Sequence, residues 1–126
     1  MSFGRPGSFG AGFGKLGGSV AAGSGAGGAP SFSAEAETLF AAMTGEPDAT
    51  RKTHIDTLIV ALKTAGVWTL LDVLYVFAAH DAQASLLNWK DPASFTATLT
   101  STPTFEADRG YTGNGSSTAI NSNYNP

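Results

Sequence analysis

Residues 33–47 contain the first run of apolar positions at helical spacing. Ser33 is a residue type favoured at a helix N-cap, and Glu35 and Glu37 fall in the first turn, where carboxylates suit the positive end of a helix. The apolar positions spaced three and four apart are Ala36, Leu39, Phe40 and Met43. Gly45 and Pro47 follow this pattern, and we therefore predict that the helix ends before them.

A second helix is predicted from Asp48, a favoured capping residue, to Gly66, a natural stop. Its apolar stripe follows the helical template without a gap and consists of Ile55, Leu58, Ile59 and Leu62. The charged residues of this segment lie outside the stripe. The pattern therefore predicts an amphipathic helix with one face toward a core.

Residues 67–79 are apolar at nearly every position. A helix that is apolar all round is buried all round, so we predict a central helix here. A central strand competes, because Val, Tyr and Phe favour strands. A short helix is predicted over 81–87, with Leu86, Leu87 and Trp89 packing inward and Asp91-Pro92 ending it.

Residues 91–126 change in character and are rich in Ser, Thr, Asn and Gly. Phe95, Ala97 and Leu99 alternate with threonines at strand period, and Phe105 starts a second extended stretch. A turn-rich segment follows at 110–116. Such short strands cannot bury a sheet alone, so we predict the opening of a larger domain or a piece that needs neighbours.

The predicted fold class is therefore mainly α. We expect a small module of three to four helices, with an extended N-terminal arm and a short C-terminal segment of strands and loops. The predicted organisation is an arm over 1–32, a helical module over 33–90 and an extended segment over 91–126. The packing residues expected in the module are Leu39, Ile55, Leu58, Leu62, Leu71, Leu74 and Trp89.

Composition sets the arm apart from the rest of the 126 residues. Of 16 glycines, 11 lie in the first 30 residues, which carry Arg5 and Lys15 but no acid, whereas the remainder has five basic and ten acidic residues. Glycine makes ordering costly, so the arm is either a flexible tail or a strap that becomes ordered on a partner. A plain linker would not carry aromatic anchors, and the anchors predicted for the strap are Phe3, Phe9, Phe13 and Leu16.

Several function classes are disfavoured by the residues present. There is no cysteine, no clustered Lys and Arg for a nucleic acid, no apolar run of the roughly 18 residues that a membrane span needs, and no secretory signal pattern. Gly14-Lys15 lacks the preceding strand and the following Ser or Thr of a phosphate loop. We therefore expect neither cofactor nor membrane insertion.

Catalytic and metal sites are also disfavoured. His54 and Asp56 would point about 200° apart on a helix, and His80-Asp81 falls at a helix junction, where His80 could bond a carbonyl. No third metal ligand has suitable spacing, and no nucleophile, base and orienting residue form a set, so we expect no enzyme. Glu106 and Asp108 are interpreted as loop acids.

Aromatic residues offer two further interpretations. The four in the apolar region are better explained as core than as a ligand platform: Trp68, Trp89, Tyr75 and Phe77. Those near the C-terminus are expected to be more exposed, and we name Tyr111, Asn114 and Tyr124 as possible contacts to a sugar or a neighbouring subunit.

The stretch from Ile55 through Gly66-Val67-Trp68 to Leu87-Asn88-Trp89-Lys90 resembles a small helical module in structural proteins of tailed bacteriophages. In that group a Gly-Tyr-x-Gly-Asn/Asp-Gly segment follows, here Gly110 to Gly115, and tends to open a concanavalin-like jelly roll. The Phe-Gly-rich start also looks like the leaders of such virion proteins. The resemblance covers roughly residues 1–115, and the sandwich is absent beyond its first strand.

The resemblance implies a virion structural protein, the anchoring or adaptor part of a fibre or decoration protein of the head or tail. The implied partners are other virion proteins of the capsid or tail, and a host-surface glycan that a missing distal domain would bind. Self-association around the apolar residues 67–79 would stabilise so small a module, so we also expect a homo-oligomer, trimeric as in many fibres. The alternative is a free-standing carbohydrate- or receptor-binding module that depends on residues 105–126.

Overall fold

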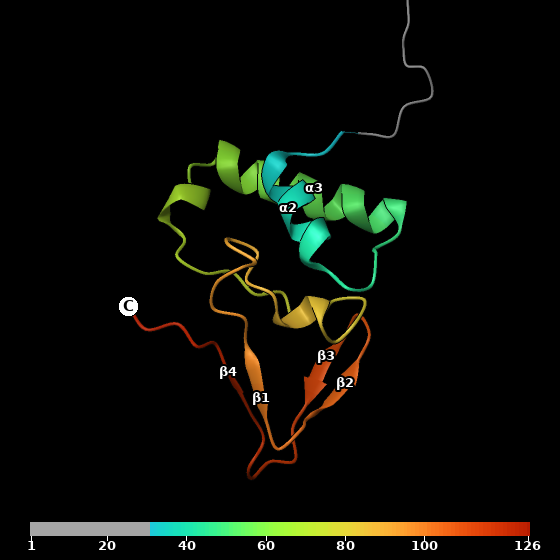
Figure 1. Cartoon of the computed structure of the whole chain (residues 1–126), viewed down its shortest axis with the longest axis vertical. Coiled ribbons are helices and arrows are strands. Elements are labelled where there is room, and N and C mark those ends of the chain that lie inside the picture. The colour runs from blue at the N-terminus through green and yellow to red at the C-terminus, as the bar shows by residue number, and fades with distance from the viewer. Residues whose placement is uncertain (1–30) are drawn as a thin grey trace, which may run out of the picture. The chain divides into compact units, whose positions relative to one another are not determined.

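A computed structural model of the chain describes residues 31–126, and Phe32–Pro126 form one unit, here called the folded unit. Figure 1 places its two α-helices at one end and its strands at the other, with residues 71–90 between them. The elements in chain order are α2 (Ala34–Ala42), α3 (Ala49–Thr64), 3₁₀ turns at Trp68–Leu70 and Ala84–Leu86, β1 (Thr98–Thr100), β2 (Thr104–Glu106), β3 (Gly110–Thr112) and β4 (Ala119–Asn121).

Helix α2 begins as predicted, but Ser33 makes a different contact from the expected one. Ser33 occupies the N-cap position without bonding the helix amides; instead its hydroxyl and its backbone N–H both donate to Asp56 Oδ1 on α3, at 2.6 and 2.8 Å. At the same end Lys63 of α3 forms an ion pair with Glu35. The start of α2 is therefore fastened to α3 by polar contacts as well as by packing.

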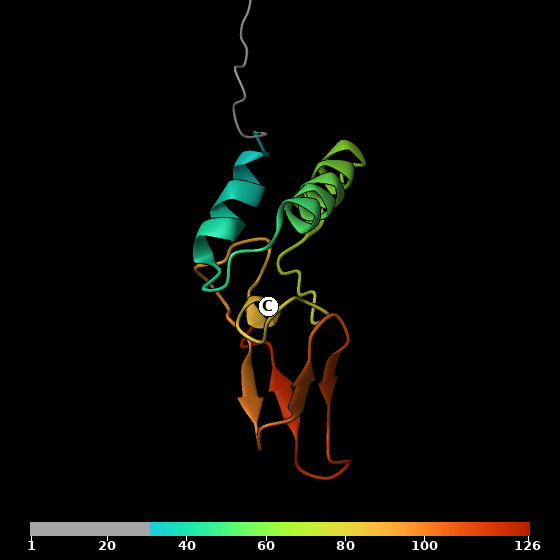
Figure 2. The same ribbon diagram turned by 90° about the vertical axis from the view of Figure 1, so that its right-hand side faces the viewer.

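Helix α3 confirms the predicted second helix. The Asp48 side chain accepts a hydrogen bond from the Arg51 amide at 2.9 Å, and this bond, the main cause, lowers the pKa of the Asp48 carboxyl. Gly66, with φ of +74°, follows the helix in the left-handed region that favours glycine. Figure 2 shows α2 and α3 side by side above the remainder of the folded unit.

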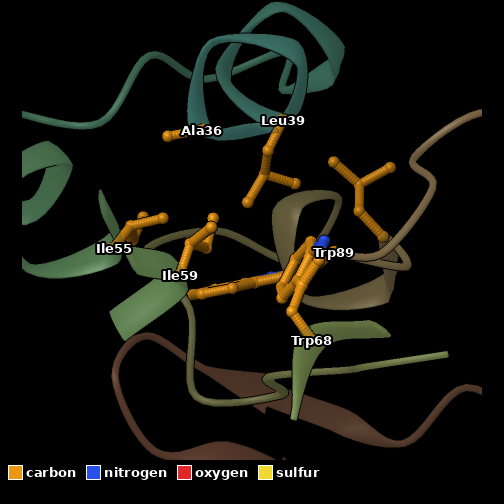
Figure 3. Packing of buried hydrophobic residues seen from close by; sticks show 7 residues of the cluster. Ala36, Leu39, Ile55, Ile59, Trp68 and Trp89 are labelled. Atoms are coloured by element: carbon orange, nitrogen blue, oxygen red, sulfur yellow. The ribbon is translucent and has the colours of Figure 1, made fainter. Parts of the chain in front are cut away.

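The core lies where α2 and α3 meet the segment after them (Figure 3). Its buried side chains are Ala36, Leu39, Ile55, Ile59, Trp68, Leu87 and Trp89. Of the predicted packing residues, Leu39, Ile55 and Trp89 are buried and Leu62, Leu71 and Leu74 are partly buried against this cluster. Leu58 is 43% exposed, so the apolar stripe of α3 is not wholly covered by α2.

The central helix predicted over 67–79 is wrong. Only Trp68–Leu70 is helical, as a single 3₁₀ turn, and the chain then runs extended without a regular element to residue 79. Leu74 and Val76 pack against the helical core, whereas the rings of Tyr75 and Phe77 stack with centroids 5.8 Å apart and Phe77 meets Tyr111 of β3. Because one face of residues 74–77 meets the helices and the other meets the strands, these neighbouring positions are apolar without being helical.

The short helix predicted over 81–87 is also reduced to a 3₁₀ turn at Ala84–Leu86. Asp81 Oδ1 accepts from the Ala84 amide at 2.7 Å and so caps this turn. Just beyond it, the buried Asn88 side chain accepts from the amides of Leu74 and Lys90, both at 3.0 Å. Asn88 therefore joins the extended segment to the chain that follows the turn.

The C-terminal part contains two antiparallel two-stranded sheets. β1 pairs with β4, with Leu99 opposite Ile120, and β2 pairs with β3, with Phe105 opposite Tyr111. The alternation predicted from Phe95 begins later, at Thr98, because Phe95 has a φ of +57° and its ring meets Tyr124. A φ in this region interrupts an extended strand.

The mainly α fold class predicted from the sequence is therefore wrong. Within residues 31–126 there are two α-helices and four short antiparallel strands, which make a small mixed α/β unit. In place of the three to four helices expected, the unit has two helices and an extended segment that contacts both the helices and the strands. Residues 33–90 and 91–126 lie within the same folded unit.

Candidate functional site: a groove beside helix α3

A groove of about 530 Å³ runs along the N-terminal half of α3. One wall is α3 itself, and the other is the extended segment from Val76 to His80. Ala84 and Trp89 contribute from the 3₁₀ turn and the residues after it. We call this feature the α3 groove; its size and largely apolar lining fall in the range of ligand sites.

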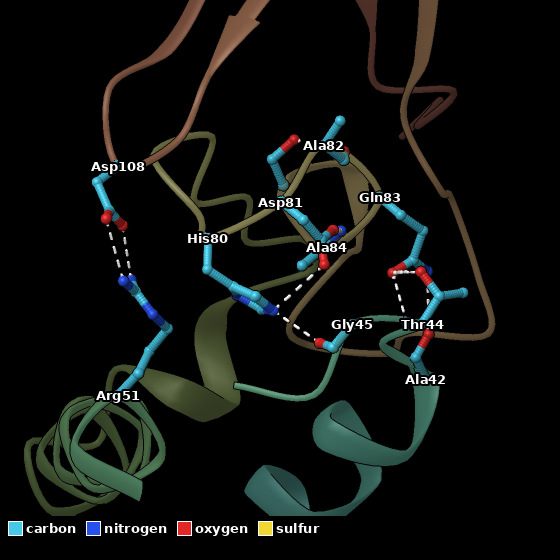
Figure 4. Close-up of polar contacts among 11 residues, drawn as sticks. Ala42, Thr44, Gly45, Arg51, His80, Asp81, Ala82, Gln83, Ala84 and Asp108 are labelled. Atoms are coloured by element: carbon cyan, nitrogen blue, oxygen red, sulfur yellow. Dashed lines mark hydrogen bonds and ion pairs between the residues drawn. The ribbon is translucent and has the colours of Figure 1, made fainter. Parts of the chain in front are cut away.

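Arg51 lines the α3 groove and pairs with Asp108, which lies outside that lining, in the turn between β2 and β3 (Figure 4). The guanidinium of Arg51 makes two contacts with the Asp108 carboxylate, Nη1 to Oδ1 at 2.8 Å and Nη2 to Oδ2 at 3.1 Å. Asp108 has a φ of +64° in the turn between β2 and β3. This forked pair therefore fixes the hairpin turn to α3.

His80 forms the opposite border and bonds a carbonyl, as the sequence suggested. Its Nε2 lies 2.7 Å from Gly45 O and 3.3 Å from Asp81 Oδ2 (Figure 4). Because a carbonyl oxygen only accepts, Nε2 carries the proton that is donated to Gly45. A Cβ on Gly45 would approach Asp81 Oδ2 to 2.3 Å, so any larger residue at this position would force the Asp81 side chain to move.

Gln83 is a structural residue that the sequence analysis missed. Its Nε2 donates to Ala42 O at 3.0 Å, and its Oε1 accepts from Thr44 N at 2.9 Å. Together with His80 it satisfies backbone groups at and just after the C-terminal end of α2. A residue 41 positions away in sequence gives no local signal of this role.

The α3 groove contains polar groups from both of its walls. His54 lines the groove from α3. His80 lines it from the extended segment and is held by the carbonyl of Gly45 and the carboxylate of Asp81. Two buried donors of lining residues, Trp89 Nε1 and Arg51 Nε, have no hydrogen-bond partner within residues 31–126. The largely apolar lining of the groove is suited to binding an apolar group.

The possible contact residues near the C-terminus lie away from this lining and bond within the folded unit. The Tyr111 hydroxyl is 2.8 Å from Ser85 Oγ and donates to Ala82 O at 3.1 Å, and the Tyr124 hydroxyl donates to Asp72 at 2.8 Å. The bond to Asp72 raises the pKa of Tyr124. Asn114 is exposed, but its side chain organises its own loop.

Tyr75, like Tyr111 and Tyr124, has a hydroxyl that bonds the C-terminal part of the chain to the segment over residues 71–90. Its oxygen lies within hydrogen-bond distance of Phe95 O and Ser122 O, and its single hydrogen serves both carbonyls. Burial raises the pKa of this hydroxyl. Trp68 and Trp89 are buried, as expected for core residues, and Tyr75 is half-buried, whereas Phe77 remains 36% exposed.

The anchor residues predicted in the arm, Phe3, Phe9, Phe13 and Leu16, lie outside the described residues. Across residues 31–126, no three or more His, Asp or Glu side chains gather where a metal ion could be held. No helix in that same part of the chain has the length and apolar character needed to cross a membrane. Neither a model of a known family, nor a curated protein, nor a solved structure matches the chain.

Proposed function

We propose that the chain is a structural component of a bacteriophage virion, the adaptor part of a fibre or decoration protein. The arm, residues 1–32, attaches it to the capsid or tail. Phe3, Phe9, Phe13 and Leu16 are the side chains that enter grooves of the neighbouring virion protein. The chain has no catalytic role in this proposal, and its partners are proteins of the particle, including further copies of itself.

The observation that supports this proposal is the contrast between the arm and the folded unit. The first 30 residues combine 11 glycines with three phenylalanines and two basic side chains, and they have no acid. The remaining residues carry a charge of −5, from five basic and ten acidic groups. A glycine-rich segment with spaced aromatics is suited to ordering on a partner, where the aromatic side chains supply the buried area.

The start of the folded unit gives the arm a fixed point of attachment. The Phe32 ring packs edge-on against Phe40 of α2 with centroids 5.4 Å apart, and Ser33 is bonded to Asp56. A pull on the arm is therefore transmitted to the contact between α2 and α3. This is the mechanical property that an adaptor needs.

A binding module is the second candidate, and the α3 groove is the observation that favours it. The groove has an apolar lining, and two of its lining residues hold buried donors without partners in the described part of the chain. A receptor group or a sugar-linked apolar group could occupy it. The hydroxyls of Tyr111 and Tyr124 give this candidate less support, because both already bond within the folded unit.

Reconstitution separates the two candidates. Full-length chain is mixed with particles that lack it, and the bound fraction is measured by sedimentation. The test variant replaces Phe3, Phe9 and Phe13 by alanine, and the matched control replaces Ser2, Ser8 and Ser19 by alanine. We expect the phenylalanine variant to lose binding and the serine variant to keep it.

A second matched pair examines the α3 groove in the same assay. Leu58 and Val60 are each 43% exposed, but two helical positions place them about 200° apart, and only Leu58 lines the groove. Loss of binding in Leu58→Arg but not in Val60→Arg, with the phenylalanine variant unaffected, would show that the groove and not the arm contacts the particle. Unchanged binding of the phenylalanine variant refutes attachment through the arm.

A further inference from the structure

The loop between β3 and β4 contains an asparagine followed by a glycine, a pair that can cyclise to a succinimide. Asn114 is followed by Gly115, and it is the one asparagine of five in the chain that precedes glycine. The loop lies at the end of the folded unit away from the helices (Figure 1). Asn114 is exposed to solvent, so water has access to it.

The loop surrounds the Asn114 side chain with donors. Oδ1 accepts from the backbone amides of Ser116 and Ser117, both at 2.9 Å, and of Thr118 at 3.2 Å. Nδ2 donates to Ser117 Oγ at 3.1 Å. Three amides that converge on one carbonyl oxygen draw electron density from its carbon and stabilise negative charge on that oxygen, as an oxyanion hole does.

The amide nitrogen next to this carbon is that of Gly115. Within residues 31–126 the N–H of Gly115 makes no hydrogen bond, whereas the amides of the three residues that follow it are all engaged. Gly115 has no side chain to obstruct an approach, and a Cβ built there would meet nothing within 4 Å. Its φ of +74° also favours glycine at this position.

We propose that Asn114 is a self-modification site, at which the folded chain converts this asparagine to an acid through a cyclic imide. The Gly115 nitrogen gives up its proton to solvent and bonds to Asn114 Cγ, and the bond from Cγ to Nδ2 breaks. Nδ2 leaves as ammonia after taking up a proton, which yields a succinimide. Water then adds to one imide carbonyl and opens the ring to aspartate or isoaspartate, without oxidation or reduction.

The loop is suited to the aspartate product. A carboxylate at position 114 can accept the same three amide bonds, now assisted by its charge. The conversion therefore adds one negative charge to an already acidic folded unit while retaining the contacts that shape the loop. Isoaspartate places an additional carbon in the backbone and loses them.

The other asparagines act as internal controls. Asn88 is fully buried, and the nitrogen after it, that of Trp89, donates to Leu74 O at 2.7 Å. Asn125 precedes proline, which has no N–H. Asn121 and Asn123 precede Ser122 and Tyr124, whose side chains hinder the attacking nitrogen.

The test follows the full-length chain during incubation at neutral and mildly alkaline pH, with peptide mapping by mass spectrometry. We expect conversion at Asn114 to be at least roughly tenfold faster than at Asn121, and to rise with pH because the attacking nitrogen must lose its proton. Gly115→Ala should slow it, and Asn114→Asp should retain the unfolding midpoint. Conversion at Asn114 no faster than at Asn121 overturns the proposal.

Comparison with the chain unfolded in urea tests the contribution of the fold. The three donors polarise Cγ in the folded chain, so the folded rate should stay within about threefold of the unfolded rate or exceed it. If folding slows the conversion by more than about threefold, the loop holds the amide away from Gly115 and the proposal is wrong. Neither result depends on whether the chain is a virion protein.

Discussion

Asn88→Ala is the substitution that most directly tests how the middle of the folded unit is held. Asn88 is fully buried and connects three backbone groups. Its Oδ1 accepts from Leu74 N and Lys90 N, each at 3.0 Å, and its Nδ2 donates to Ser94 O at 3.3 Å. Alanine removes all three bonds and leaves two amides without their acceptor.

The expected cost follows from those two amides. A buried donor that loses its partner costs roughly 1–3 kcal/mol, and the contacts here are partly buried, so about 1–1.5 kcal/mol each is appropriate. We therefore expect the free energy of unfolding to fall by about 2–3 kcal/mol. With a urea dependence of about 1 kcal/mol per molar for a unit of this size, the midpoint should fall by about 2–3 M.

Trp68 and Trp89 are both buried in the core, so their fluorescence reports unfolding in urea. The matched control is Asn125→Ala, an exposed position, which should change stability by no more than about 0.5 kcal/mol. If Asn88→Ala unfolds within about 0.5 kcal/mol of the unsubstituted chain, the extended segment is not held by this amide. The account of residues 71–90 would then be wrong.

Three further substitutions test other contacts by the same unfolding assay. Ile59→Ala, at a position with no exposed surface, should cost about 3 kcal/mol, whereas Val60→Ala beside it should cost no more than about 0.5 kcal/mol; equal losses would contradict the burial pattern. Tyr75→Phe removes the hydroxyl shared by two carbonyls and should cost about 1 kcal/mol, and an unchanged midpoint would deny that bond a role. The hydrogen bond from Lys63 is the main cause that lowers the pKa of Glu35 below its ordinary value of 4.5. The ion pair therefore stabilises the folded unit above pH 4.5, and this stability is lost as the pH falls through the lower pKa of the folded state. Lys63→Gln should therefore reduce the loss of stability between about pH 5 and pH 3, and an unchanged acid response would exclude the pair as its source.

The local patterns predicted the two helices well, because their signals are contained within each segment. Asp48 caps α3 through its own side chain, and Gly66 ends it with a positive φ. The stripe of α3 indicated which face is covered, since Ile55 and Ile59 are buried. These features need no knowledge of the remainder of the chain.

Residues 67–79 could not be assigned in this way, because covered helices and covered extended segments share the same composition. Leu74 packs against the helical core, whereas the ring of Tyr75 stacks on Phe77. Neighbouring positions are therefore apolar because each contacts a different group of apolar residues. The extended segment is bonded at Leu74 to the buried amide of Asn88, 14 residues further along the chain. Contacts over such separations leave no periodicity in the sequence.

The candidate site was harder to predict for the same reason. The α3 groove is formed by residues from α3 and from the extended segment, which meet only in the fold. The pairing of Arg51 with Asp108 likewise spans 57 positions. Asn114 was recognised as exposed, but its three converging amides depend on the conformation of the loop.

The proposal that the arm attaches the chain to a particle is tested most directly by amide hydrogen exchange of residues 1–30. Exchange is measured once in the isolated full-length chain and once in assembled particles. The account predicts markedly slower exchange around Phe3, Phe9 and Phe13 in the particle, because these side chains become buried there. Equal exchange in the two states would contradict it.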